Sequence, residues 1–249
     1  MINESLVLSL LALIAVSVGI TIIGLWFVRR FFDLATIKHE EVIAGYLFNA
    51  ILFVYAVVLA FVVFAVWEKY SLTQQSVTNE AAALVVAFRD TQTLPEPVRT
   101  DAQAALKGYA FIVMSREWAS HGSVLRHTTP DPLNAVWKIY REGNFQDQQL
   151  SLRALENQRH LRHLAGEASL PFIFWPLLIG GGFITITFSY FFVMKHFATQ
   201  ALLTALFTLV IVGVLALIFS LNYPFTGPVQ ISQDPFRHAL EQFNALNLN

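Results

Sequence analysis

The sequence predicts an all-α membrane protein in which four transmembrane helices are interrupted, between the second and the third, by a helical extramembrane domain. Of its 249 residues, 55% are hydrophobic and only 13% are charged, whereas soluble domains carry about 25% charged residues. Four apolar stretches are long enough to cross a hydrocarbon core about 30 Å thick. The polar stretch between the second and the third keeps a helical spacing of apolar residues and shows no strand-like alternation.

The first pair of spans is expected within residues 1–70, at about 6–28 and 45–67. The residues before the first span contain no Lys or Arg, so we expect a retained helix and not a cleaved signal peptide. The second span has no charged residue, and it ends at Trp67–Tyr70, a group of aromatic and charged residues typical of the membrane interface.

The rest of the chain divides by the same criteria. Residues 71–170 form the predicted helical domain, a small bundle of helices. Residues 171–222 hold the second pair of spans, at about 173–194 and 201–221, and a short amphipathic tail is expected at 223–249.

Two connecting segments have a different character from the predicted helices around them. Residues 29–44 mix apolar with charged side chains, so we expect an amphipathic turn or short helix at the membrane surface. Residues 120–132 contain Gly122, Pro130 and Pro132 and are predicted to form a loop. A short helix is expected after this loop.

One helix of the predicted domain, from Phe145 to Ser169, shows the pattern of a helix–helix interface. Six of its residues follow one another in alternating steps of four and three, which is the spacing of a coiled-coil contact. We interpret the single asparagine among them as a residue that sets the register of this contact. The set, called the seam below, is Leu150, Ala154, Asn157, Leu161, Leu164 and Ala168.

Composition excludes several classes of function. The net charge of −1 argues against nucleic-acid binding, and the absence of cysteine excludes disulfides and thiol chemistry. The sequence has no glycine-rich phosphate loop, and its His39–Glu40–Glu41 stretch lacks the second histidine of a zinc-protease motif because residue 43 is Ile. We therefore expect a protein that is not an enzyme and needs no cofactor.

An ordered set of short motifs extends over nearly the whole chain. It comprises Gly45-x-Leu-Phe, Tyr55-Ala-Val-Val-Leu-Ala-Phe-Val-Val, Trp67-Glu-x-Tyr70, Glu80-Ala, Phe88-Arg89, Tyr109, Glu117-Trp118, Arg159-x-x-Arg162, Pro171-x-x-x-Trp175 and Pro224-Phe225-x-Gly227. Taken in this order, the set resembles the bacterial bestrophin-like family of four-span membrane proteins, which is distantly similar to the bestrophin anion channels.

The resemblance implies an architecture and an activity. Bestrophins are pentameric channels for small inorganic anions, with a cytoplasmic helical domain and a second helix that lines an aromatic-rich neck. By analogy, we expect a homo-oligomer among the lipids of a bacterial inner membrane, with its domain in the cytoplasm. The face of the second helix that would line the pore has an alternative interpretation, namely ordinary packing against other helices. The residues that would line the pore, called the neck residues below, are Phe53, Val57, Phe61 and Phe64.

The chain departs from the bestrophin pattern after its fourth predicted span. Bestrophins carry an acidic calcium-binding cluster there, whereas only Asp234 and Glu241 follow Leu221 in this chain. The acidic residue that the family usually has before its Pro-Phe pair is replaced by Asn222 or Tyr223. The resemblance therefore does not extend to calcium gating.

Two sets of polar residues in the helical domain are candidate sites. Arg159 and Arg162 precede the third span by about two turns, where they would concentrate anions at a channel mouth or bind lipid phosphates. The second set shares one stripe of the same helix, and it would chelate a metal or titrate near neutral pH. A solvated face with Glu–His pairs is the alternative. The stripe consists of Glu156, His160, His163 and Glu167.

These observations favour two functions over a membrane-embedded enzyme. The first is an oligomeric bestrophin-like ion channel that conducts anions and is gated by dewetting at the neck residues. The second is a membrane-anchored interaction or sensor protein without conduction, in which the spans serve as an anchor and the helical domain binds partner proteins.

Overall fold

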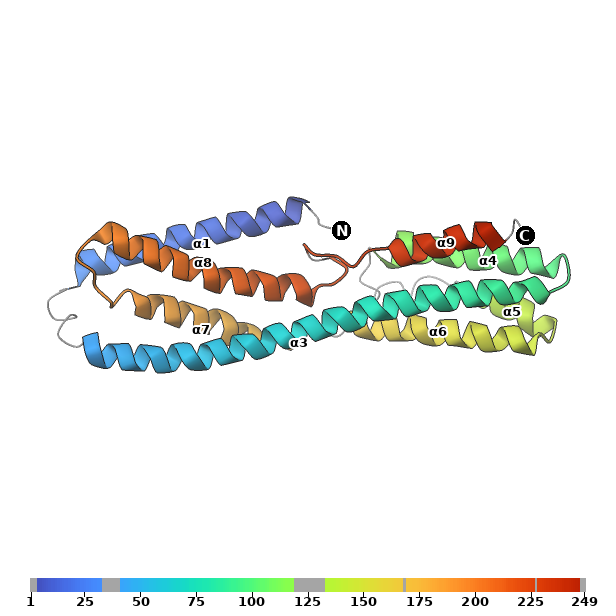
Figure 1. The fold of residues 1–249 in the computed structure, drawn as a ribbon, viewed down its shortest axis with the longest axis horizontal. Helices are drawn as coiled ribbons and strands as arrows, with labels where there is room; N and C mark the ends of the chain where they lie inside the picture. Colours follow the sequence, from blue (N-terminus) through green and yellow to red (C-terminus); the bar gives the residue numbers. More distant parts are fainter. Residues whose placement is uncertain (1–3, 33–40, 119–132, 168, 227, 247–249) are drawn as a thin grey trace. The chain divides into compact units, whose positions relative to one another are not determined.

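The computed structural model describes residues 4–32, 41–118, 133–167, 169–226 and 228–246. The predicted all-α class is confirmed for these residues (Figure 1). Half of the connector expected at 29–44, namely 33–40, and the whole loop expected at 120–132 lie outside the described residues. The described part contains eight α-helices, namely α1 (Glu4–Phe31), α3 (Glu41–Asp90), α4 (Val98–Ile112), α5 (Asn134–Glu142), α6 (Gln146–Glu167), α7 (Phe174–Ser189), α8 (Phe197–Asn222) and α9 (Asp234–Leu246).

The chain divides into two compact units. The first, called the membrane unit below, consists of residues 2–67 and 170–222. The second, called the polar unit, consists of residues 68–169 and 223–249 together with residue 1. Helix α3 contributes residues to both units.

Helix α3 is longer than the sequence pattern suggests. The interface residues at Trp67–Tyr70 were expected to close a span, but α3 continues through them for a total of 50 residues and ends at Asp90. The sequence contains no Gly or Pro between Tyr46 and Leu94. A helix ends where its backbone hydrogen bonds are lost or where a strong helix breaker such as Pro occurs. A change from apolar to polar side chains alters only the environment of the helix.

Among the described residues, three helices are long and apolar enough to cross a bilayer: Ser5–Phe31, Ile43–Thr93 and Phe197–Asn222. The fourth apolar helix, α7, has 16 residues, which corresponds to a length of about 24 Å. The span predicted at 173–194 is thus shorter in the structure. The backbone amides of Tyr190 and Phe191 bond to the carbonyl oxygens three residues earlier, those of Thr187 and Phe188, so the α-helical pattern ends there.

A tyrosine and two glycines join α3 to α7 in the membrane unit. The Tyr55 hydroxyl donates a hydrogen bond of 2.8 Å to the backbone oxygen of Leu178, and its side chain is buried. A Cβ atom added at Gly181 would lie 2.6 Å from the Tyr55 ring, and one at Gly182 would lie 3.0 Å from its hydroxyl. Glycine is required here because the ring occupies the place of a side chain.

The polar unit has a hydrophobic core to which α9 contributes. Phe88 of α3 stacks on Phe243 of α9 with ring centroids 3.9 Å apart. The indole of Trp118 lies edge-on to the rings of Phe225 and Phe236. The amphipathic tail predicted from the sequence is therefore a helix whose aromatic side packs into this core.

The close approach of Tyr55 to Gly181 leads to a stability prediction. In the variant Gly181→Val the Tyr55 ring must move and lose its bond to Leu178, and overpacking of this kind costs about 1–3 kcal/mol. The thermal unfolding midpoint in detergent should fall by about 2–12 °C for a protein of this size. In the control Gly180→Val nothing lies within 4 Å of the added Cβ, so the midpoint should change little. Equal midpoints for the two variants would contradict this account.

Candidate functional site

Helix α3 packs through one face and leaves the opposite face uncovered. The packed face includes Tyr55, Val62 and Val66, which are buried and recur at helical spacing. The neck residues lie on the other side of the helix, where Phe53, Phe61 and Phe64 are 69%, 71% and 65% exposed, and Val57 is also exposed. The described residues of the chain therefore do not cover the neck residues, and their role at a pore stays a prediction.

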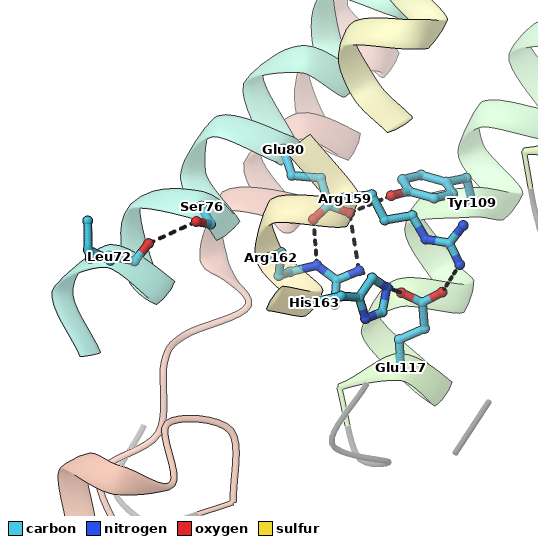
Figure 2. A network of polar contacts seen from close by, with 8 residues as sticks. All are labelled: Leu72, Ser76, Glu80, Tyr109, Glu117, Arg159, Arg162 and His163. Atoms are coloured by element: carbon cyan, nitrogen blue, oxygen red, sulfur yellow. Dashed lines mark hydrogen bonds and ion pairs between the residues drawn. The ribbon is translucent and has the colours of Figure 1, made fainter. Parts of the chain in front are cut away.

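A network of buried charges joins three helical segments of the polar unit (Figure 2). Arg162 of α6 donates from Nε to Oε2 of Glu80 on α3 at 2.5 Å, and from Nη2 to Oε2 of Glu117 at 2.5 Å. Arg159 donates to the other oxygen of Glu117 at 2.6 Å, and the Tyr109 hydroxyl donates to Glu80. Glu80 is 0% and Arg162 2% exposed. We call Glu80, Tyr109, Glu117, Arg159, Arg162 and His163 the charge network.

The position of Glu117 depends on a local change in helix type. The chain continues beyond α4 as a five-residue π-helical segment, Val113–Glu117. Its wider turn is closed by a bond of 3.0 Å from the Trp118 amide to the backbone oxygen of Val113, five residues earlier. π-Helical segments are rare in proteins, and those that do occur are often found at functional sites. Here the segment presents the carboxylate of Glu117 to Arg159 and Arg162 of α6.

Burial and charge act in opposite directions on the ionisable groups of the charge network. Burial disfavours the carboxylate of Glu117, but the adjacent His163 ring and the charges of Arg162 and Arg159 outweigh it, so the pKa of Glu117 is far below its ordinary value. Burial also opposes the Arg162 cation, yet the Glu80 carboxylate raises the pKa of Arg162 overall. Burial and then the charge of Glu80 raise the pKa of Tyr109, which remains a hydrogen-bond donor.

The structure assigns the two predicted arginines to protein partners. Both guanidinium groups bind carboxylates of the charge network, and two carboxylates balance two guanidinium groups. Sequence reasoning did not select Glu80 and Glu117 as site residues. One signal was present, because Glu80 lies among the buried apolar positions Val77, Ala81 and Leu84 of α3, where an acidic side chain requires a cationic partner.

The predicted stripe of acidic residues and histidines on α6 is divided by the fold. His163 is buried, with Nε2 at 3.5 Å from Oε2 of Glu117, whereas Glu156, His160 and Glu167 are exposed. In the described part of the chain, no three side chains of His, Cys, Asp or Glu are grouped closely enough to hold a metal ion. The pH-sensing and metal interpretations of this stripe stay predictions.

The seam on α6 does not face the core of its own unit. The inward side of α6 carries Leu152 and Leu155 with the charge network, whereas Leu150, Leu161 and Leu164 are 64%, 41% and 48% exposed. Ala154 and Asn157 are exposed as well. Ala168 lies outside the described residues. The coiled-coil spacing thus marks a surface that the described chain leaves open.

The charge network predicts a large effect of removing its central cation. In Arg162→Met, the buried carboxylate of Glu80 loses its cationic partner and Glu117 keeps only Arg159 as a cationic partner; breaking a buried ion pair typically costs about 3–5 kcal/mol. The thermal unfolding midpoint in detergent should fall by about 6–20 °C. The matched control is Arg153→Met, at an exposed position of the same helix, and its midpoint should stay within a few degrees of the wild type. A midpoint of Arg162→Met as high as that of the control would show that the network contributes little to stability.

The sequence and the structure were compared with those of known proteins. The bestrophin-like domain family matches residues 15–236 of the chain. A bacterial bestrophin homologue from Klebsiella pneumoniae carrying a tryptophan-to-alanine mutation has a similar structure, with a TM-score of 0.72 at 13% identity, over 99% of this chain and 100% of the other. A membrane protein with a proline-to-alanine mutation has a TM-score of 0.67 at 13% identity, over 98% and 99% of the two chains. No curated protein sequence matches the chain.

At these identities the structural similarity shows a shared fold. The family match covers most of the sequence and includes α3, the charge network and α6. The protein therefore belongs to the bestrophin-like family.

Proposed function

We propose that this protein is a homo-oligomeric ion channel of a bacterial inner membrane that conducts small anions. The α3 helices of several copies would surround an axial path, with the neck residues facing that path. By analogy with bestrophins the oligomer would be a pentamer, and the polar unit would lie in the cytoplasm. Bestrophin-like proteins are typically channels and not enzymes, in agreement with the lack of any catalytic motif in the sequence.

The observation that supports this proposal best is the uncovered aromatic face of α3. Three phenylalanines on one side of a membrane helix are left outside the packing of the chain, in a family whose namesakes use their second helix as a neck. Rings of such side chains form a hydrophobic constriction, through which ions pass only when the constriction is hydrated. Lipid contact alone would not require aromatics at these positions.

A four-span topology is part of the proposal. Helix α7 is shorter than the hydrocarbon core, but exposed apolar residues, Phe172 and Ile173, precede it. A short span is accommodated by local thinning of the bilayer at modest cost. With α7 as a fourth crossing, the three connections between the membrane unit and the polar unit, at residues 67–68, 169–170 and 222–223, would all lie on the same side of the bilayer.

The arginines of α6 have a smaller role in this proposal than the resemblance suggested. Arg162 is fully engaged by Glu80 and Glu117, so an anion or a lipid phosphate could bind it only by displacing a carboxylate. Arg159 is less buried than Arg162 and pairs with Glu117. Of the two, Arg159 is the candidate for contacts with anions or lipid phosphates.

The exposed seam supports assembly of several copies. Leucines at coiled-coil spacing on an exposed helix face are typical of helix–helix association. The same surface also supports the second candidate, an interaction or sensor protein whose polar unit binds another protein. In the channel proposal a second copy of this chain covers the seam, whereas in the second candidate a different protein covers it.

Conduction can be tested in proteoliposomes. Wild-type protein should release chloride faster than empty vesicles, and Phe61→Ala should raise the efflux rate. If the wider neck lowers the barrier by about 1.4 kcal/mol, the increase is about tenfold. The control Phe27→Ala removes an exposed ring from α1 and should leave the rate unchanged. Wild-type efflux equal to that of empty vesicles, or the same rate in both variants, would refute the channel proposal.

The role of the seam can be tested by adding charge to it. The double variant Leu161→Asp with Leu164→Asp should shift the mass of the purified protein in detergent toward smaller species, because like charges would face one another between copies. His160→Asp, an exposed position of α6 outside the seam, should keep the wild-type mass. An unchanged mass together with the loss of a different co-purifying protein would favour the second candidate.

A further inference from the structure

The membrane unit contains a crevice that the proposed channel does not use. It has a volume of about 460 Å³ and lies between α1, α7 and α8, with Ser17, Ile186 and Val212 among its lining residues. Trp175 and Tyr190, near the two ends of α7, also line it. None of its described lining residues comes from α3, so the crevice is separate from the neck residues.

Small residues help to form the crevice. Gly182 of α7 lines it, and a Cβ at this position would lie 3.1 Å from Ile211 of α8, so the absence of a side chain lets α7 and α8 approach closely here. At the other end the Tyr190 side chain reaches α1, since a Cβ at Gly24 would lie 3.0 Å from the Tyr190 hydroxyl. The crevice therefore has a narrow end at Tyr190 and extends along α7 to Trp175.

The lining is apolar in its chemistry although it includes hydroxyl groups. Ser17 donates to the backbone oxygen of Leu13 at 2.8 Å, Thr21 to that of Ser17 at 2.9 Å, and Thr208 to that of Thr204 at 2.8 Å. Each of these hydroxyls is thus satisfied within its own helix. These three hydroxyls have no donor left for a water molecule, and a buried water needs about three hydrogen bonds.

The dimensions of the crevice suit a single hydrocarbon chain and are too small for a helix. Trp175 and Tyr190 are about 22 Å apart along α7 at the rise of an α-helix. Spread over that length, the volume open to the centre of a water molecule is roughly 5 Å across, so the gap between the lining surfaces is roughly 8 Å, whereas a helix with its side chains is about 10–12 Å wide. A helix of a second copy is therefore too large for the crevice. An empty crevice would lose the dispersion contacts of its lining.

We propose that the crevice binds one acyl chain of a membrane lipid. The surrounding medium supplies this occupant, because the membrane unit lies in hydrocarbon and its spans contact acyl chains on their outer faces. The acyl chain would lie along α7 between α1 and α8, and its lipid would exchange more slowly than the lipids around the protein. It would complete the packing of α1 against α7.

The first experiment uses full-length wild-type protein reconstituted with a phosphatidylcholine that carries a diazirine on one acyl chain. The protein is extracted, washed with detergent and irradiated, and the labelled residues are located by mass spectrometry. The expected result is label concentrated on crevice residues such as Ser17, Ile186 and Val212. Label distributed equally over exposed positions outside the crevice, such as Val210, or no retained label would overturn the proposal.

The second experiment compares two substitutions on α8. Val212→Phe places a ring in the crevice, and Val210→Phe adds the same ring at an exposed position outside it. Native mass spectrometry of washed protein should show lipid retention lowered by about tenfold for Val212→Phe only. Equal retention in both variants would overturn the proposal. If Val212→Phe does not fold, the labelling of the wild type decides. Neither readout depends on conduction.

Discussion

The polar unit depends on the neutralisation of one buried arginine. Arg162 lies between Glu80 of α3 and Glu117 of the π-helical segment, and removing these charges from water costs several kcal/mol for each ion. Their mutual attraction offsets that cost only if all of them meet at hydrogen-bonding distance. The network thus requires that α3, the end of α4 and α6 keep one register, and it excludes arrangements that the apolar core alone would tolerate.

Helix α3 serves both units through different faces and different residues. In the membrane unit, Tyr55, Val62 and Val66 pack inward and the neck residues remain uncovered. In the polar unit, Val77, Leu84 and Phe88 form part of the core, and Glu80 lies among them. A single helix without an internal breaker thereby combines the surface proposed for the pore with the acidic partner of the charge network.

Hydropathy and periodicity were sufficient to predict the all-α class and the long apolar helices, because these depend on local composition. The continuation of α3 past Trp67 was missed, since the polarity of the chain changes there and its helix-forming tendency does not. The charge network could not be predicted because its members are brought together from positions 80, 109, 117 and 159–163, which only the tertiary fold places side by side. The spacing of the seam was recognised, but periodicity cannot tell an inward face from an outward one, and Leu152 and Leu155 occupy the inward face.

The balance of charge in the network has an electrostatic consequence. Two anions and two cations within hydrogen-bonding distance act on their surroundings as a multipole, whose potential decays faster with distance than that of a single ion, and salt screens the remainder within about 10 Å. An ion moving through the proposed channel would not sense Arg162 as a positive charge. Discrimination between chloride and sodium must then arise from uncompensated charges or backbone dipoles elsewhere along its route.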